Sequence, residues 1–174
     1  TLYRAQIIAT DQAGRSSTYN FSFDTFLPGG AIAIEAEDYN YAGGQTKPDP
    51  IGVNAFANLA GTPGIDYFDQ NISTTATDYR PGEFVGLANS GDVARDSITS
   101  AGGTDYVVNQ IDAGEWLNYT RTFPSDTSGE YEVYLRASST ADQRVQLDQL
   151  TGATGTTQTT TPLGVFIVTA SGYS

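Results

Sequence analysis

The stretch from 106 to 120, YVVNQIDAGEWLNYT, shows how this chain alternates strand-like and turn-like segments. Residues 106–111 are rich in valine, isoleucine and tyrosine, residues 112–115 are Asp-Ala-Gly-Glu, and a second apolar run begins at Trp116. β-Branched and aromatic side chains favour strands, whereas Asp and Gly favour turns. The stretch therefore predicts two short strands, 106–111 and 116–123, with a turn between them.

The same alternation continues in both directions along the 174 residues. Further strands are predicted at 2–9, 18–23, 31–39, 131–137, 145–147 and 163–168. Residues 40–103 are rich in Gly, Pro, Asn and Asp and predict loops with short strands, and the Thr/Gly-rich residues 151–161 predict an exposed loop. The sequence indicates no amphipathic helix, so it predicts an antiparallel all-β sandwich.

The composition excludes several classes of function. The chain has 8 basic and 20 acidic residues, a net charge of −12, so the phosphates of nucleic acids and of anionic membranes would be repelled. It contains neither cysteine nor histidine, which excludes a disulfide framework and a Ser-His-Asp triad. No apolar run is long enough to span a membrane. Neutral sugars and divalent cations remain as candidate ligands.

Three segments resemble, in order and spacing, carbohydrate-binding module family 6. They are IEAEDY at 34–39, the stretch at 106–120 with its GEW signature, and SGEYEVYLRAS at 128–138. Between the first two, GIDYFD at 64–69 and YRPGE at 79–83 resemble the long-loop subgroup that accompanies agarases and β-glucanases. The resemblance implies a jelly-roll β-sandwich in a secreted or cell-surface protein that binds β-linked polysaccharide without catalysis.

The predicted domain organisation has three parts. Residues 31–174 form the module-like sandwich, which is incomplete at its C-terminal end because the last strands of the family have no counterpart. Residues 1–26 resemble the terminal strands of a bacterial immunoglobulin-like domain, or are a hairpin that a partner completes. Residues 27–30, Leu-Pro-Gly-Gly, are the linker.

The resemblance also nominates carbohydrate-binding residues. Tyr173 matches a loop aromatic of the family, and Gln110 occupies its second platform position, where an amide can hydrogen-bond but cannot stack. Tyr67, Phe68 and Tyr79 lie in the long loops and either build a replacement platform or pack in the interior. Trp116 is the only tryptophan, and we expect it to pack in the core or against a sheet, with stacking on sugar as the alternative.

Glu35 and Glu37 are the candidate metal ligands. On the predicted strand their carboxylates would leave the same face about 7 Å apart, and a Ca²⁺ ion would relieve their repulsion. The alternative is that both are solvated at the surface. The resemblance implies a structural Ca²⁺ ion held by this pair.

We do not expect an enzyme. Asp66 and Asp69 could be a carboxylate pair of a glycosidase, calcium ligands or turn formers, and turn formers are the commonest use of such residues. The predicted function is non-catalytic polysaccharide binding. The alternative is a building block of an extracellular surface or filament protein, joined by β-strand addition to neighbouring domains or to other copies.

Overall fold

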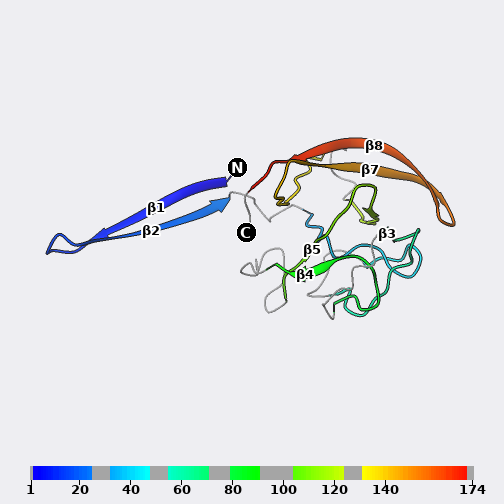
Figure 1. Ribbon diagram of the computed structural model, residues 1–174, viewed down its shortest axis with the longest axis horizontal. Helices are drawn as coiled ribbons and strands as arrows, with labels where there is room; N and C mark the ends of the chain where they lie inside the picture. Colours follow the sequence, from blue (N-terminus) through cyan, green and yellow to red (C-terminus); the bar gives the residue numbers. More distant parts are fainter. Residues whose placement is uncertain are drawn as a thin grey trace.

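The computed structural model describes residues 2–24, 32–47, 55–70, 79–90, 104–123 and 131–171. Within these ranges the chain is all-β and antiparallel, without a helix, and therefore without a helix that could span a membrane. Its strands form four two-stranded sheets, β1–β2, β3–β6, β4–β5 and β7–β8 (Figure 1). The bounds are β1 Leu2–Thr10, β2 Ser16–Asp24, β3 Tyr67–Phe68, β4 Leu87–Asn89, β5 Tyr106–Val108, β6 Trp116–Leu117, β7 Gln143–Thr154 and β8 Thr157–Val168.

The β1–β2 hairpin confirms the two strands predicted at 2–9 and 18–23. Asp11 organises its turn, because its carboxylate accepts the backbone N–H groups of Ala13 at 2.9 Å and Arg15 at 3.0 Å. Gly14 has a φ of 80°, a conformation that glycine adopts without steric cost. The hairpin extends away from the rest of the molecule (Figure 1). The linker predicted at 27–30 lies outside the described residues.

The β7–β8 hairpin is longer than predicted and arches over the short strands (Figure 1). It includes residues 145–147 and 163–168, as expected. The prediction of an exposed loop at 151–161 was wrong. Most of that segment continues the two strands up to a tight turn at Gly155, whose φ is 56°. Threonine is β-branched and suits a strand, so a Thr-rich segment extends a hairpin as readily as it forms a loop.

Two predicted strands are not formed in their described parts. Residues 131–137 are exposed and form no strand with any described part of the chain. Residues 32–39 are interrupted by a turn in which the Asp38 N–H donates to the Glu35 carbonyl at 3.1 Å. The argument that Glu35 and Glu37 leave the same face of one strand was therefore wrong.

The stretch 106–120 does form strands, but they are short and do not pair with each other. β5 pairs with β4 and β6 pairs with β3, so residues 112–115 connect two different sheets. Both partner strands come from the loop-rich region 40–103, where short strands were expected. Partner choice depends on residues distant in sequence, which local patterns do not reveal.

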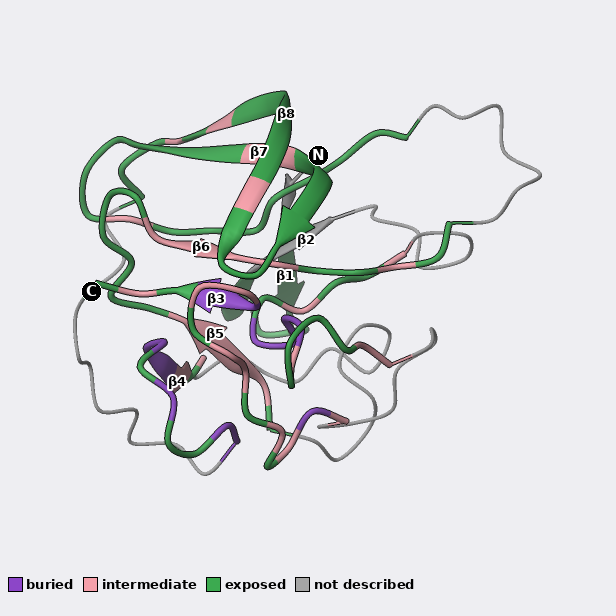
Figure 2. Ribbon diagram, turned by 90° about the vertical axis from the view of Figure 1, so that its right-hand side faces the viewer, coloured by how far each residue is buried: buried purple, intermediate pink, exposed green. Residues whose placement is uncertain are grey.

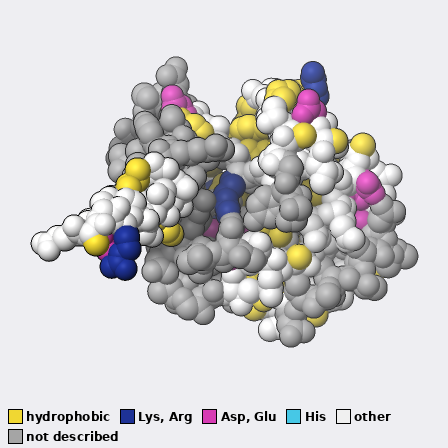
Figure 3. All heavy atoms as spheres, turned by 60° about the vertical axis from the view of Figure 1, so that its left-hand side comes forward, with side chains coloured by type: hydrophobic (Ala, Val, Ile, Leu, Met, Phe, Trp, Pro, Cys, Tyr) yellow, Lys and Arg dark blue, Asp and Glu magenta, His cyan; other side chains and the backbone are white. Residues whose placement is uncertain are grey.

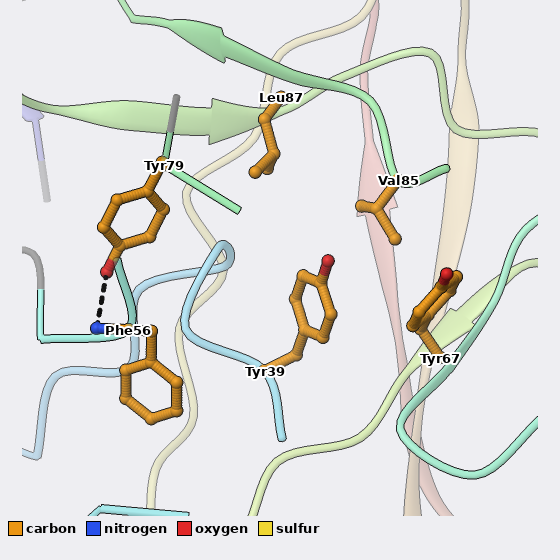
Figure 4. Packing of buried hydrophobic residues seen from close by; sticks show 6 residues of the cluster. All are labelled: Tyr39, Phe56, Tyr67, Tyr79, Val85 and Leu87. Atoms are coloured by element: carbon orange, nitrogen blue, oxygen red, sulfur yellow. Dashed lines mark hydrogen bonds between the residues drawn. The ribbon is translucent and has the colours of Figure 1, made fainter. Parts of the chain in front are cut away.

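The core lies among these short strands and their loops. Figure 2 shows the buried segments gathered there, while both hairpins are mostly exposed. Its members are aromatic or aliphatic and belong to one cluster (Figure 4): Tyr39, Phe56, Tyr67, Tyr79, Val85 and Leu87. Within the described ranges each strand contacts only its own partner strand. Loop side chains therefore provide the packing that joins the small sheets.

Candidate functional site

A fully buried arginine anchors the loops on which the candidate site rests. Arg80 donates to the carbonyls of Tyr39 at 2.5 Å and Asn40 at 2.9 Å, and its Nε lies 3.1 Å from a carboxylate oxygen of Glu83. The guanidinium carbon is 3.5 Å from the centroid of the Tyr39 ring. Burial raises the pKa of the Tyr39 hydroxyl, which stays protonated and donates to the other Glu83 oxygen. Residues 39–40 are thereby fixed against residues 80–83.

Acidic side chains gather beside this anchor. The Tyr79 hydroxyl donates to Asp38 at 2.5 Å, while the neighbouring Glu37 is buried and its Oε2 has no hydrogen-bond partner among the described residues. Burial, and then the charges of Glu35, Asp38 and Asp105, raise the pKa of Glu37 to about 8. Within the described ranges no three acidic side chains come close enough together to hold a metal ion. Glu37 thus presents a buried carboxylate, and the half-buried Glu35 is near enough to raise its pKa.

An aromatic pair lies at the surface on the small sheet β3–β6. Phe68 is directly opposite Trp116, with ring centroids 6.4 Å apart and planes inclined by 25°. Rings that are nearly parallel at this separation are strongly offset, so they overlap little and lie side by side. Phe68 is 42% exposed and Trp116 is half-buried. The pair therefore offers a partly uncovered aromatic surface.

Hydrogen bonds fix the two segments that carry this pair. The Gln70 N–H donates to Glu115 Oε1 at 3.0 Å, and the Gln70 side-chain amide donates to the Ala113 carbonyl at 2.7 Å. The other Glu115 oxygen accepts the Asp112 N–H at 2.7 Å. Gly114 has a φ of 94°, and a Cβ there would lie 3.1 Å from Gln70 Nε2. The turn after β5 and the end of β3 form one cross-linked support.

The structure separates four of the residues nominated for carbohydrate binding. Tyr67 and Tyr79 are buried in the core, which fits the packing alternative and leaves neither ring open to solvent. Gln110 is exposed and has a φ of 55°, which is uncommon for a residue with a side chain. Tyr173 lies outside the described residues. Of the four, only Gln110 is described and exposed.

Sequence reasoning named Phe68 as a possible platform residue but missed its pairing with Trp116, which was expected to pack in the core or against a sheet. The available signal was the alternation within Tyr67-Phe68, because neighbouring residues on a strand face opposite sides. With Tyr67 buried, Phe68 points outward and meets Trp116 on the same face.

Asp66 has a structural position that fits the turn-forming alternative. It is fully buried, and its carboxylate accepts three backbone N–H groups, from Gly43 at 2.8 Å, Gly44 at 2.6 Å and Thr62 at 2.8 Å. A carboxylate held in this way organises loops. A catalytic carboxylate must reach its substrate, and the buried carboxylate of Asp66 cannot.

Comparison of this chain with protein families, with curated proteins and with solved structures found no match in any of the three.

Proposed function

We propose that this chain is a non-catalytic module that binds β-linked polysaccharide, with the Phe68–Trp116 pair as its contact surface. The observation that carries the proposal is the partly exposed, offset aromatic pair on β3–β6. The resemblance of three sequence segments to carbohydrate-binding modules supports it. The jelly-roll closure of the sandwich belongs to the same proposal, as does a secreted or cell-surface location.

The chemistry of the pair suits a sugar chain. Sugar rings present patches of C–H bonds that stack on aromatic faces, and neighbouring polar groups fix the hydroxyls. Glu115 and Gln70 lie beside the pair, and each carboxylate oxygen of Glu115 retains acceptor capacity beyond its backbone contact. The net charge of −12 favours a neutral polymer over an acidic one.

A structural Ca²⁺ ion is the second part of the proposal. Ca²⁺ takes oxygen ligands, and the buried Glu37 Oε2, which has no hydrogen-bond partner in the described ranges, is an oxygen of this kind. Glu37 and Glu35 would hold the ion, with carbonyl, amide or water oxygens completing its shell. The ion would neutralise a locally negative loop cluster, and we assign it no part in contacting sugar.

Affinity electrophoresis through soluble β-glucan, xylan and agarose, with an α-glucan as comparison, tests the proposal. Retardation by a β-linked polymer is expected for the wild type. Phe68→Ala and Trp116→Ala should abolish it, while Tyr134→Ala, which removes a more exposed aromatic elsewhere, should not. Migration of the wild type unchanged by every polymer would refute polysaccharide binding. Equal loss in all three variants would refute the assignment of this surface.

A further inference from the structure

Exposure alone does not identify a binding site on this protein. Hydrophobic side chains reach the surface at several separate places on the face drawn in Figure 3. Ile7 and Ile8 point to opposite faces of the β1–β2 hairpin, yet they are similarly open, at 56% and 59%. The Phe68–Trp116 pair differs from these surfaces, because a hydrogen-bonded side-chain amide lies at each end of the two strands that carry it. The positions of the two amides bear on how a sugar chain lies on the pair.

The first amide belongs to Gln70. Its Nε2 donates to the Ala113 carbonyl at 2.7 Å. Gln70 follows β3 and Ala113 precedes β6, so this amide lies at the end of the sheet where β3 finishes and β6 begins. A side-chain amide has two N–H groups and a carbonyl oxygen, so one hydrogen bond fixes it and leaves groups that can meet sugar hydroxyls.

The second amide belongs to Gln158, near the tip of the β7–β8 hairpin. Its Nε2 donates at 3.0 Å to the carbonyl of Ile65, which precedes β3. The same carbonyl accepts the side-chain amide of Asn118 at 2.6 Å, and Asn118 directly follows β6. The hairpin tip lies close to β3 in both ribbon views (Figures 1 and 2). Gln158 therefore lies at the end of the sheet where β3 begins and β6 finishes.

The tip of the hairpin is closely seated at this end. Gln158 is half-buried, whereas every other residue from 149 to 165 is exposed. Gly64 has a φ of 77°, and a Cβ there would lie 2.9 Å from the methyl carbon of Thr156. Glycine thus permits the close approach of the tip. The position of Gln158 is set by this contact and by its bond to Ile65.

The rings and the amides lie along different directions on the small sheet. Phe68 and Trp116 are directly opposite each other, so the line that joins their rings runs across β3 and β6. The two amides lie at the two ends of the strands, on either side of that line. Ile65 and Gln70 are five positions apart in the sequence, which limits their separation to about 17 Å. Within the described ranges no further strand pairs with the outer edge of β3 or β6.

We propose that Phe68 and Trp116, with Gln70 on one side and Gln158 on the other, hold an internal stretch of a β-linked polysaccharide. The inference rests on the proposed polysaccharide function. A chain that stacks on both rings crosses the strands and passes between the two amides, which meet hydroxyls along its two sides. No described strand blocks its path beyond either ring, so the sugar chain continues in both directions. The site binds the middle of a chain and makes no use of its ends.

Binding capacity at two polymer lengths tests whether the site takes internal stretches. Soluble β-glucan, xylan and agarose are each compared, at equal mass, before and after partial hydrolysis to chains of half the average length. Hydrolysis doubles the number of chain ends and leaves the number of internal units almost unchanged. Saturation of the protein, measured by isothermal titration calorimetry, should therefore need the same mass of polymer in both samples.

The possible failures of this experiment are distinguishable. A capacity that doubles with the number of ends would overturn the inference and leave polysaccharide binding in place. The absence of binding to all three polymers would instead refute the proposed function, and the inference with it.

Variants of Gln158 test its contact with sugar. Fluorescence of Trp116, the only tryptophan, measures affinity for the same polymers. Gln158→Ala should weaken binding about tenfold, as expected for the loss of a hydrogen bond in a binding site. Gln149→Ala, which removes an exposed amide of the same hairpin away from its tip, is the matched control and should not weaken it. Unchanged affinity in Gln158→Ala, or equal losses in the two variants, would reject the assignment of Gln158.

Thermal unfolding of the same variants separates sugar contact from support of the fold. The Ile65 carbonyl retains its bond from Asn118 when Gln158 is replaced, so Gln158→Ala should melt at the same temperature as Gln149→Ala. A weaker affinity accompanied by a lower melting temperature in Gln158→Ala alone would show that Gln158 supports the fold, and would overturn its role as a sugar contact.

Discussion

The two hairpins and the loop-rich centre of this protein contrast in where order and burial lie. The hairpins contain the long, regular strands, yet their side chains are mostly exposed. The centre has strands of two or three residues, yet it contains the fully buried side chains, among them Arg80, Tyr39 and Asp66. Regular hydrogen bonding along a hairpin is satisfied locally, whereas an irregular core needs side chains to satisfy its loops. Regular secondary structure is therefore a poor guide to which region of this molecule contributes most to its stability.

The sharpest test of this contrast compares two arginines that each pair with an acid. Arg80 is fully buried with Glu83, and Arg15 is exposed with Asp11. Arg80→Met should lower the free energy of unfolding by about 3–5 kcal/mol, because it removes the positive partner of a buried carboxylate and a donor to three backbone carbonyls. Arg15→Met should change it by no measurable amount, since water solvates the Asp11 carboxylate. Urea unfolding measures both. Similar losses in the two variants would contradict the contrast.

The buried acid cluster makes a second large prediction, measured in the presence of a chelator. The pKa of Glu37 is raised from an ordinary value near 4.5 to about 8 in the folded protein. Between these two values the folded state binds more protons than the unfolded state, so stability falls as pH rises through this window. The slope reaches at most about 1.4 kcal/mol per pH unit for one group. Glu37→Gln should remove most of this slope, and the raised pKa of Asp38 should maintain part of it.

Calcium should oppose that loss of stability. An ion that binds only the folded state adds about 2.7 kcal/mol at a hundredfold excess over its dissociation constant. We expect Ca²⁺ to raise the melting temperature at pH 8 more than Mg²⁺ does, and Glu35→Gln with Glu37→Gln to abolish the increase. Identical melting curves in Ca²⁺ and in chelator would rule out the proposed ion.

These contrasts also explain how far sequence reasoning could go. The β1–β2 hairpin was predictable because alternation and the Asp11–Gly14 turn are local signals. The partners of β5 and β6 were not, because they come from residues about 20 and 50 positions away. Arg80 gave no sign of its burial, since arginine is usually at the surface and its acceptors are backbone carbonyls that any sequence provides. The Phe68–Trp116 pair depended on the same non-local pairing, so the sequence could offer Phe68 as one of three possible platform residues but could not place Trp116 beside it.

A smaller difference in stability is expected when either of two tyrosine hydroxyls that donate to carboxylates is removed. In the core, Tyr79 donates to Asp38 and also accepts the Phe56 N–H at 3.2 Å (Figure 4), whereas the exposed Tyr134 donates to Glu132. Tyr79→Phe should destabilise by about 1–3 kcal/mol because two buried groups lose their partner. Tyr134→Phe should have no measurable effect on unfolding. Thermal and urea unfolding of the pair of variants provide the comparison, and a loss confined to Tyr134→Phe would reverse it.

The smallest expected effect concerns the strained backbone at Gln110, between the centre and the proposed sugar surface. Its φ of 55° costs a residue with a side chain roughly 1 kcal/mol relative to glycine. The preceding Asn109 is held by its N–H bond to the Gly86 carbonyl at 2.9 Å, so the turn cannot relax freely. Gln110→Gly should therefore leave stability unchanged or raise it by up to about 1 kcal/mol, because relief of strain is partly offset by the greater freedom of glycine in the unfolded chain.

If the amide contacts sugar, the same variant should weaken polysaccharide binding, whereas Gln110→Asn, which retains an amide and tolerates this conformation, should weaken it less. Unfolding and affinity electrophoresis on the same samples separate the two effects. A destabilised Gln110→Gly variant with unaltered binding would show that Gln110 supports the fold rather than the surface.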